Sequence, residues 1–436
     1  MNAVNIGLIG LGTVGAGTLE ILQRNSRDIA GRAGREIRVT QIAVQDLKKQ
    51  RPVDTGDITL TDDPMQVVND PDIDIVVELI GGESVARQVV LGAIDNGKHV
   101  VTANKALIAL HGNHIFEQAQ EKGLMVAFEA AVAGGIPIIK SLREGLSANR
   151  IQWVAGIING TCNYILTKME QEGLDFAEVL RDAQSLGYAE ADPTFDIEGI
   201  DAAHKLTILA SIAFGIPLQF EKVFVEGITA VTVDDIRYAA ELGFRIKHLG
   251  IARRDPKGIE LRVHPALVPK ERLIANVNGV MNAALVMSDA VGPTLYYGPG
   301  AGAEPTGSAV VADIVDVVRA LTSDPNNRVP HLAFQPGALA ALPIMQIGQV
   351  ETAFYLRMSV INRPGVLAAI TRIFGDSKIS IATILQKGHD AEGGEVSIIM
   401  LTQATSGTRM SNAIEQIEAL EPVTSKITAI RLENLA

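Results

Sequence analysis

The 436-residue sequence has a single cysteine, Cys162, and no long hydrophobic run. One thiol excludes a disulfide within the chain and a cysteine-based metal cluster, and it fits a reducing compartment, so we expect a cytoplasmic protein. The apolar start, residues 1–9, lacks the basic region and the small-residue cleavage site of a signal peptide. Because no run elsewhere reaches about 18 apolar residues, we also expect no membrane span.

Positive charge is also scarce. The 38 lysines and arginines stand against 50 aspartates and glutamates, which gives a net charge of −12. An acidic surface disfavours nucleic acid and anionic membranes as partners, although a local basic pocket for a phosphate remains compatible with it. The proportions of hydrophobic residues (47%) and charged residues (20%) are those of a folded protein, and the length predicts two or three domains.

Short apolar strands alternate with helices over the first 150 residues. The patterns predict strands at 4–9, 37–44, 73–79, 99–102 and 125–129, with helices at 14–23 and 84–96. This alternation predicts an α/β fold with a doubly wound parallel sheet of the Rossmann type.

The pattern changes after residue 150. Helices are predicted at 163–172, 176–186 and 200–214, before a strand-rich stretch at 223–297. In that stretch, the strands 249–253 and 259–264 flank the turn Asp255-Pro256-Lys257-Gly258, as in a hairpin. Helices followed by strands predict an α+β domain with an open antiparallel sheet, and a partner subunit is a natural cover for such a sheet.

The last part of the chain predicts a separate small domain. A strand (352–360), a helix (365–374), two strands (379–386 and 395–402), a helix (410–420) and a strand (427–432) follow one another. This βαββαβ order is ferredoxin-like. We therefore expect a dinucleotide-binding domain at 1–150 joined by a returning helix at about 303–322, a substrate-binding and dimerisation domain at 151–302, a linker at 323–350, and a regulatory domain at 351–436.

A glycine pattern follows the first strand and opens the first helix. It reads Gly10-Leu11-Gly12-Thr13-Val14-Gly15, in which the glycines permit a tight turn, close approach of a pyrophosphate and close helix–strand packing. The helix N-terminus favours the phosphates. The alternative is a purely structural turn, but this context predicts dinucleotide binding.

The residues after the second strand leave the choice between NAD and NADP open. Gln45 is predicted to lie beside the cofactor, and Asp46 could accept a ribose 2′-hydroxyl, as in NAD enzymes. Lys48, Lys49 and Arg51 follow at once, and they would suit a 2′-phosphate or be a solvated loop. The sequence slightly favours NADP over NAD.

Two lysines are candidates for redox chemistry, which needs a proton donor beside the hydride path. Lys105 follows the strand at 99–102, at the edge where open α/β sheets bind ligands. Lys205 and Asp201 lie four residues apart on one predicted helix, and Glu190 precedes that helix in a loop. From the pattern alone, an exposed i,i+4 salt bridge is the favoured interpretation of Asp201 and Lys205.

Five longer motifs resemble those of homoserine dehydrogenases. They are Val-Thr-Ala-Asn-Lys-Ala-Leu (101–107), Phe-Glu-Ala-Ala-Val-Ala-Gly-Gly-Ile-Pro (128–137), Gly-Ile-Ile-Asn-Gly-Thr-Cys-Asn-Tyr-Ile-Leu (156–166), Leu-Gly-Tyr-Ala-Glu-Ala-Asp-Pro (186–193) and Gly-Pro-Gly-Ala-Gly-Ala-Glu-Pro-Thr-Gly-Ser-Ala-Val (298–310). They stand in the family's order over most of residues 1–320. The resemblance implies reversible reduction of aspartate 4-semialdehyde to homoserine by NAD(P)H.

The resemblance also implies roles for individual residues. Lys205 would donate the proton to the developing alkoxide, and Lys105 would lie beside the nicotinamide and the substrate oxygen. Glu190 and Asp201 would hold the substrate's ammonium, because carboxylates suit a cationic amine. The residues expected around the substrate are Gly187, Tyr188, Asn159 and Thr161. Gly302, in Gly300-Ala301-Gly302, would close over the cofactor.

In the family, a monovalent cation, usually sodium, is bound by residues that match Glu129, Val132, Gly134 and Ile136. Oxygen ligands fit a hard cation, and the alternative is a structural turn in which Glu129 acts as a cap. Cys162 matches a position that needs no nucleophile, so we interpret it as a buried packing thiol. His204 points away from Lys205 on a helix and is expected to pack.

The segment Val360-Ile361-Asn362-Arg363-Pro364-Gly365-Val366-Leu367 resembles the strand-to-helix loop of ACT domains, which bind amino acids. The resemblance implies feedback control, with threonine as the expected effector and Asn362, Pro364, Gly365 and Val366 as its contacts. The alternative is a domain kept for oligomerisation alone. We expect the monofunctional form, without a kinase domain, as a homodimer or homotetramer.

Two other functions remain open from the sequence. One is a Rossmann reductase of a different amino-acid semialdehyde. The other is a non-catalytic regulator that binds a nucleotide and an amino acid, although such a protein has no need for Lys105, Glu190, Asp201 and Lys205 together.

Overall fold

The structure is a computed structural model that describes residues 3–387 and 393–435. Contacts between residues divide the chain into two compact units. Unit 1 comprises Met1–Gly160, Asp201–Val223 and Val280–Leu342, and unit 2 comprises Thr161–Ile200, Phe224–Gly279 and Pro343–Ala436. Each unit therefore contains segments that are distant in the sequence.

A six-stranded parallel sheet forms the first part of unit 1. Its strands, in the order β3-β2-β1-β4-β5-β6, are β3 (Thr59–Thr61), β2 (Ile37–Ala43), β1 (Val4–Ile9), β4 (Ile75–Glu78), β5 (His99–Thr102) and β6 (Val126–Ala127). The strand order reverses between β1 and β4, since β2 and β3 follow on one side and β5 and β6 on the other, and this is where Rossmann sheets bind dinucleotides. The Rossmann fold predicted from the sequence is confirmed. The strand expected at 125–129 is shorter, because Glu129 already begins a 3₁₀ turn.

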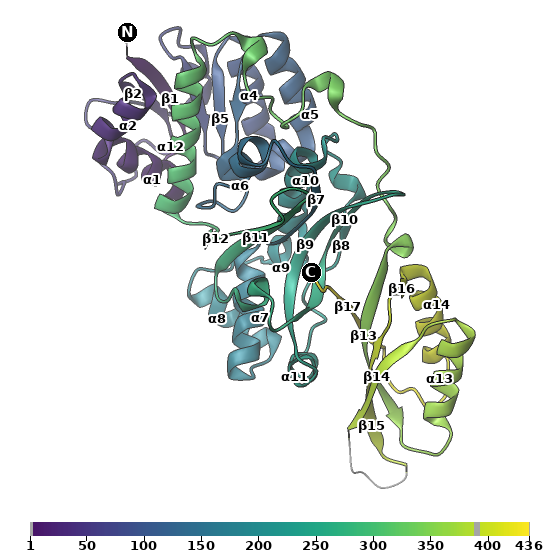
Figure 1. The fold of residues 1–436 in the computed structure, drawn as a ribbon. Helices are drawn as coiled ribbons and strands as arrows, with labels where there is room; N and C mark the ends of the chain where they lie inside the picture. Colours follow the sequence, from purple (N-terminus) through teal and green to yellow (C-terminus); the bar gives the residue numbers. More distant parts are fainter. Residues whose placement is uncertain (1–2, 388–392, 436) are drawn as a thin grey trace. The chain divides into compact units, whose positions relative to one another are not determined.

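Helices flank this sheet. They are α1 (Thr13–Arg24), α2 (Ser26–Ala33), α3 (Pro64–Asn69), α4 (Ser84–Asp95), α5 (Lys105–Glu121) and the returning α12 (Ala303–Ala320). Helix α12 runs beside α1 (Figure 1). Glycines permit this approach, because a Cβ on Gly17 would lie 2.3 Å from the Ala303 carbonyl oxygen, and one on Gly307 would lie 2.9 Å from the Gly17 backbone. The helix after residue 302 is therefore an integral part of the nucleotide-binding fold.

Unit 1 also contains an antiparallel sheet segment and a buried helix. Strand β11 (Met281–Ser288) pairs with both β12 (Pro293–Pro299) and β7 (Ile151–Ile157). The sequence patterns did not predict β7. Helix α10 (Ile200–Phe214) is buried along most of its length, while α6 (Ile138–Lys140) continues into a π-helical turn at Ser141–Gly145.

Unit 2 begins with helices and continues into a long hairpin. The helices are α7 (Gly160–Glu172), α8 (Phe176–Ser185) and α9 (Thr194–Ile197), and the hairpin is made by β9 (Phe244–Asp255) and β10 (Gly258–Pro269), with β8 (Phe224–Val225) paired to β10. The predicted hairpin is confirmed, with longer strands. The stretch expected to be rich in strands also contains helix α11 (Val233–Glu241), which begins with a capping box between Thr232 and Asp235.

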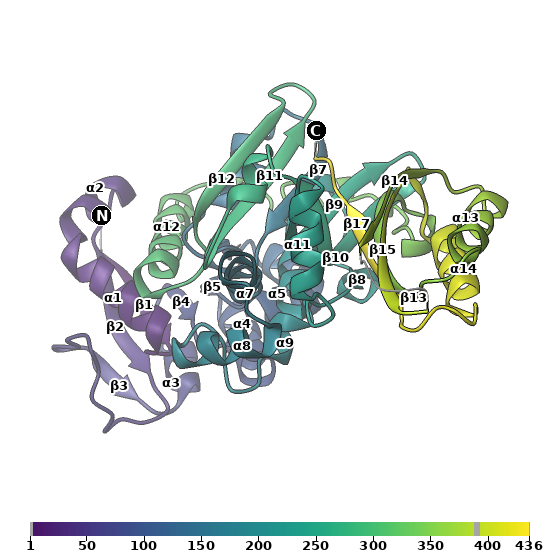
Figure 2. The same cartoon turned by 90° about the horizontal axis from the view of Figure 1, so that it is seen from below.

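The last part of unit 2 has the predicted βαββαβ order. It consists of β13 (Glu351–Ile361), α13 (Val366–Asp376), β14 (Ile381–Lys387), β15 (Glu395–Thr402), the short β16 (Thr405–Ser406), α14 (Gly407–Glu418) and β17 (Thr428–Leu432). Helices α13 and α14 lie side by side on one face of its sheet (Figure 2). Strand β17 pairs with β13 and also, in parallel, with β10, so one sheet runs from the hairpin into this region.

The segment expected as a linker, 323–350, contains three 3₁₀ turns, at Pro325–Asn327, Pro336–Ala338 and Ile347–Gln349. No helix in the described part of the chain is long and apolar enough to cross a membrane.

Candidate active site

The glycine turn after β1 has the geometry of a phosphate cradle. Gly10 has a φ of +99°, and a Cβ there would lie 2.9 Å from the Leu79 backbone. A Cβ on Gly15 would lie 2.2 Å from the Gly10 carbonyl oxygen, so this glycine permits close packing of the helix on the strand. A Cβ on Gly12 would have no atom within 4 Å. The turn is therefore closed on the protein side and open at Gly12, and the first turn of α1 has no acidic residue that would repel a phosphate.

The carboxyl ends of β4 and β5 lie beside each other and fix the start of α5. Buried Glu78 accepts hydrogen bonds from the Thr102 hydroxyl (2.6 Å) and from two backbone N–H groups, of Ile80 and Gly81. Burial raises the pKa of Glu78. Asn104 caps α5 by accepting from Leu107 N (3.0 Å). Lys105, the first residue of this helix, is thereby held at the edge of the sheet where ligands bind.

Lys105 and Lys205 share one buried carboxylate. The Lys205 ammonium lies 2.7 Å from one oxygen of Asp201, and the Lys105 ammonium lies 2.9 Å from the other. The Asp201 side chain is 3% exposed, whereas Lys205 is 12% exposed and Lys105 34% exposed. The interpretation of Asp201 and Lys205 as an exposed helical salt bridge is therefore wrong, because the pair is buried and includes a third charge.

The end of β7 completes this cluster. Ile158 accepts a hydrogen bond from the Lys205 ammonium through its carbonyl oxygen (2.8 Å), and Asn159 donates its amide to Asp201 (2.8 Å). Burial alone would raise the pKa of Asp201, but the charges of Lys205 and Lys105 outweigh it and hold the pKa well below its usual range. Asp201 is therefore an anion that keeps two ammonium groups together.

His204 and Cys162 behave as the sequence predicted for packing residues. The His204 ring lies 4.3 Å from the Phe220 ring between centroids, and the ring is almost fully buried. Burial lowers the pKa of His204. Cys162 is fully buried, and its sulfur contacts the Asp196 carbonyl oxygen at 3.2 Å.

The expected substrate residues of unit 2 lie around the start of α7. The Thr161 hydroxyl donates to the Tyr188 carbonyl oxygen (2.7 Å) and lies 3.2 Å from an oxygen of Asp196. Gly187 has a φ of +74° just after α8, which turns the chain toward Tyr188 and Glu190. The Glu190 side chain is exposed. Unit 2 thus presents the exposed carboxylate of Glu190 in a loop that Thr161 holds through the Tyr188 carbonyl oxygen.

Glu129, the expected cation ligand, caps α6. Its two oxygens accept from Ile139 N (2.9 Å) and Lys140 N (2.7 Å), and burial raises its pKa to about 7. Gly134 has a positive φ and lies against Gly300, since a Cβ there would be 2.6 Å from the Gly300 carbonyl oxygen. Among the described residues, no cluster of three or more His, Cys, Asp or Glu side chains is placed to hold a metal ion. Any cation here would depend on backbone carbonyls such as those of Val132, Gly134 and Ile136.

The loop after β2 is basic and partly folded on itself. Arg51 donates to the carbonyl oxygens of Asp46 and Lys49, and the Asp46 carboxylate accepts from Lys48 N (2.8 Å). Gln45 is exposed at the start of this loop. Gly302 precedes α12 with a φ of +128°, which other residues rarely adopt.

A cavity of about 450 Å³ lies at the loop between β13 and α13. It is lined by Asn362, Pro364, Gly365 and Val366, the four residues expected to contact an effector, together with Gln386 and Val396. Gly365 has a φ of +92° and precedes the first turn of α13.

These features define a nicotinamide-dependent oxidoreductase that carries a small ligand-binding module. Comparison with known families is more specific. Family models for homoserine dehydrogenase match residues 137–315, those for the NAD-binding domain of homoserine dehydrogenase match residues 10–129, and those for the ACT domain match residues 354–422. The chain belongs to the homoserine dehydrogenase family.

Individual relatives agree with this assignment. A homoserine dehydrogenase of Pseudomonas aeruginosa is 60% identical over 435 residues, with 100% of both chains covered, and one of Neisseria gonorrhoeae is 52% identical with the same coverage. The crystal structure of a homoserine dehydrogenase from Thiobacillus denitrificans has a TM-score of 0.96 and 62% identity, and it covers 100% of this chain and 99% of that one. The enzyme class, the Rossmann fold and the ACT domain predicted from the sequence are thereby confirmed.

The structure identifies residues that position the two lysines and that the sequence analysis did not. Glu78, Thr102 and Asn104 were not predicted, although each is a polar residue at or after the end of an apolar strand, which is a usable signal. The contact between Lys105 and Asp201 joins residues 96 positions apart and leaves no local pattern.

Proposed function

We propose that the enzyme catalyses the reversible, NAD(P)-dependent reduction of L-aspartate 4-semialdehyde to L-homoserine, a step of threonine, methionine and isoleucine biosynthesis. The observation that carries this proposal is the cluster of Lys105 and Lys205 around the buried Asp201 in a member of the homoserine dehydrogenase family. A carbonyl reduction develops negative charge on oxygen, and two ammonium groups are suited to stabilise it.

The cofactor fits the residues around the glycine turn. The open position at Gly12 and the unneutralised start of α1 suit a pyrophosphate, with Gly10, Leu11, Thr13, Val14 and Gly15 as the cradle and with Gln45, Lys105 and Gly302 as further contacts. When bound, the nicotinamide supplies or accepts the hydride. We favour NADP, because Lys48 and Lys49 lie beyond β2, and because a related archaeal homoserine dehydrogenase (28% identity, TM-score 0.61, 72% of this chain and 97% of that one) is described in complex with NADPH.

Lys205 is the proposed proton donor. In the direction of reduction, its ammonium gives a proton to the aldehyde oxygen as the hydride reaches the carbon, and the lysine regains the proton from solvent. In homoserine oxidation, neutral Lys205 removes the hydroxyl proton. Lys105 supplies a second positive charge at the oxygen, and Asp201 holds both ammonium groups in place.

Glu190 and Asp201 are the proposed ligands of the substrate's ammonium, with Asn159, Thr161, Gly187 and Tyr188 around it. Both oxygens of Asp201 already accept from lysines. We therefore assign the larger part of ammonium binding to Glu190, whose carboxylate is exposed.

Further proposals concern regulation and assembly. Threonine is the proposed effector at the cavity beside Gly365, sodium is a proposed ligand of Glu129 and the neighbouring carbonyls, and the proposed assembly is a homodimer or homotetramer. We also propose a cytoplasmic location and the three-domain division given above, which the separate family matches support.

The test is the homoserine-dependent change in absorbance of NADP and NAD, with Lys205→Ala as the matched control. We expect turnover by the unchanged enzyme and a loss of kcat of about 1,000-fold in the variant, since general acid–base catalysis contributes about 100- to 10,000-fold. No turnover with either cofactor would contradict the proposed reaction. Faster reduction of another amino-acid semialdehyde would assign a different substrate to the same site.

A further inference from the structure

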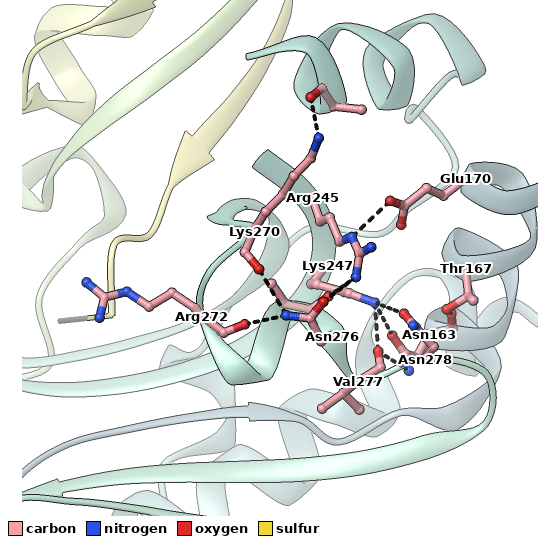
Figure 3. Close-up of polar contacts among 12 residues, drawn as sticks. Asn163, Thr167, Glu170, Arg245, Lys247, Lys270, Arg272, Asn276, Val277 and Asn278 are labelled. Carbon is pink, nitrogen blue, oxygen red and sulfur yellow. Dashed lines mark hydrogen bonds and ion pairs between the residues drawn. The ribbon is translucent and has the colours of Figure 1, made fainter. Parts of the chain in front are cut away.

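Lys247, in the middle of β9, is a second buried lysine that the reaction does not use. Its side chain is 1% exposed. Its ammonium donates to the Val277 carbonyl oxygen (2.7 Å), to the side-chain oxygen of Asn278 (3.1 Å) and to that of Asn163 (3.4 Å), as Figure 3 shows. The three acceptors come from helix α7 and from the segment just before β11.

All three acceptors of Lys247 are neutral. The charged groups that face it are Glu170 on α7 and Arg245 on β9, and these two pair with each other at 3.0 Å. Burial lowers the pKa of Lys247 to about 8, and Glu170 only partly offsets this. A buried ammonium without a direct carboxylate is costly, because amide and carbonyl oxygens replace only part of its hydration.

The contacts of Lys247 continue into a network that holds the beginning of α7. Asn163 donates its amide to the carbonyl oxygens of Val277 (3.2 Å) and Gly279 (2.9 Å). Thr167 donates its hydroxyl to the Asn163 carbonyl oxygen (2.6 Å) and accepts from Gly279 N (3.1 Å). The first two turns of α7 are thus fastened to residues 277–279, and Lys247 supplies an ammonium to this network.

The first turn of α7 also carries Thr161, whose hydroxyl holds the Tyr188 carbonyl oxygen. Tyr188 lies between Gly187 and Glu190 in the loop proposed to bind the substrate. We propose that Lys247 is a positioning residue for the amino-acid substrate, which acts through Asn163 and α7 on Thr161 and the loop at 187–190. This inference rests on the proposed function, because it needs that loop to bind the substrate's ammonium.

The first test replaces Lys247 by methionine, which keeps the length of the side chain and removes the donors. The matched control is Lys98→Met. Lys98 is also buried (4% exposed), also donates to backbone carbonyls (of Asp70 and Ile73), and lies before β5, at the edge of the sheet opposite to the glycine turn. Both variants lose a buried ammonium clamp, but only Lys247 is connected to Thr161.

We expect Lys247→Met to raise the KM for homoserine by about 10-fold or more while kcat and the KM for NADP change by less than about 2-fold, the signature of lost substrate binding. Lys98→Met should leave all three constants unchanged, although both variants unfold at lower urea concentration. Equal kinetic constants in the two variants would overturn the positioning role. If the unchanged enzyme does not oxidise homoserine, the proposed function is wrong. Equal kinetic constants in two active variants contradict the positioning role alone, so the two failures are distinguishable.

The second test keeps Lys247 and changes its environment, which guards against a Lys247→Met variant that fails to fold. Asn278→Asp places a carboxylate at the acceptor 3.1 Å from the ammonium and should raise the pKa of Lys247 by about one unit or more. The KM for homoserine, measured against pH, should begin to rise near pH 8 in the unchanged enzyme and at a higher pH in this variant. Superimposable profiles would overturn the proposal.

Discussion

Lys205 is largely enclosed and Lys247 is buried, but the surroundings of the two lysines differ. Lys205 donates to a carboxylate, Asp201, that also holds Lys105, whereas Lys247 donates to amide and carbonyl oxygens. A carboxylate keeps an ammonium charged, and a shared carboxylate can hold two cations close to a developing oxyanion. Neutral oxygens hold an ammonium in one place without strongly stabilising its charge. The first arrangement suits chemistry, and the second suits positioning.

The largest effect is expected from removing the shared anion. Asp201→Asn leaves Lys105 and Lys205 next to each other without a negative charge, so one of them should lose its proton or move away. We expect kcat for homoserine oxidation to fall by about 1,000-fold, comparable to the loss of the proton donor itself. Steady-state kinetics with NADP measure this directly.

The control is a buried carboxylate outside the reaction. Asp235 is fully buried in unit 2 and accepts from Arg357 Nε (2.6 Å) and from the Tyr355 hydroxyl (3.1 Å). Asp235→Asn should cost about 3 kcal/mol of stability, since it breaks a buried ion pair, and should leave kcat nearly unchanged. A similar fall of kcat in both variants would contradict a specific role of Asp201 in catalysis.

His99 is a further buried basic side chain, and it extends the comparison of the two lysines because burial keeps its imidazole neutral. Its Nδ1 accepts from Met125 N (3.0 Å), and burial lowers its pKa from 6.5 to about 4. Between these values the unfolded chain binds a proton that the folded chain does not, so the free energy of unfolding should fall as the pH falls from 6.5 to 4, by at most about 3 kcal/mol.

Urea unfolding at several pH values measures this loss. His99→Asn keeps an acceptor but does not titrate, so its stability should depend less on pH than that of the unchanged protein. Parallel curves for the two proteins would show that folding does not lower the pKa of His99.

A smaller effect is expected at Lys105, which is 34% exposed. Solvent screens part of its charge, so Lys105→Met should lower kcat/KM by about 30-fold, less than the loss of a fully buried donor to an oxyanion. Lys122→Met, at the other end of α5, removes an exposed partner of Asp95 (2.6 Å) and should have no kinetic effect. Equal losses in these two variants would contradict a role for Lys105 at the oxygen.

The smallest effect is expected at an exposed pair. Arg24 on α1 lies 2.8 Å from Glu304 on α12, and both side chains are about half exposed. Water competes for such a pair, so Arg24→Met should leave the urea midpoint and the kinetic constants unchanged within error. A clear loss of stability would mean that α1 and α12 depend on this charge pair more than on their packed glycines.

Much of the fold could be predicted because its signals are local. The strand at 99–102 is the short run His-Val-Val-Thr, whose adjacent valines favour a strand, and the structure places β5 at those residues. Helix α11 was missed because its nine residues lie in a stretch dominated by strand patterns, and β7 was missed because helical patterns follow it closely. Lys105 lies in the motif at 101–107, just after the strand at 99–102, so its place at the edge of the sheet could be predicted.

The partners within the site were less predictable. The four-residue spacing of Asp201 and Lys205 indicates a shared helix face, but not that β7 buries this face through Ile158 and Asn159. Lys247 leaves no signal at all, because its acceptors lie 30 or more positions away in the sequence.

Strand β17 has a consequence for the order in which the enzyme matures. It pairs in parallel with β10 (Ala266 with Arg431) and antiparallel with β13, and it follows every other strand of unit 2 in the chain. During synthesis, the part of β10 at Ala266 and Leu267, beyond the residues that pair with β8, therefore leaves the ribosome without its partner strand, and more than 150 further residues follow before β17 can pair with it. At about 5–20 residues per second this takes on the order of ten seconds or more, during which the nascent chain exposes a sheet edge to chaperones and to other nascent copies.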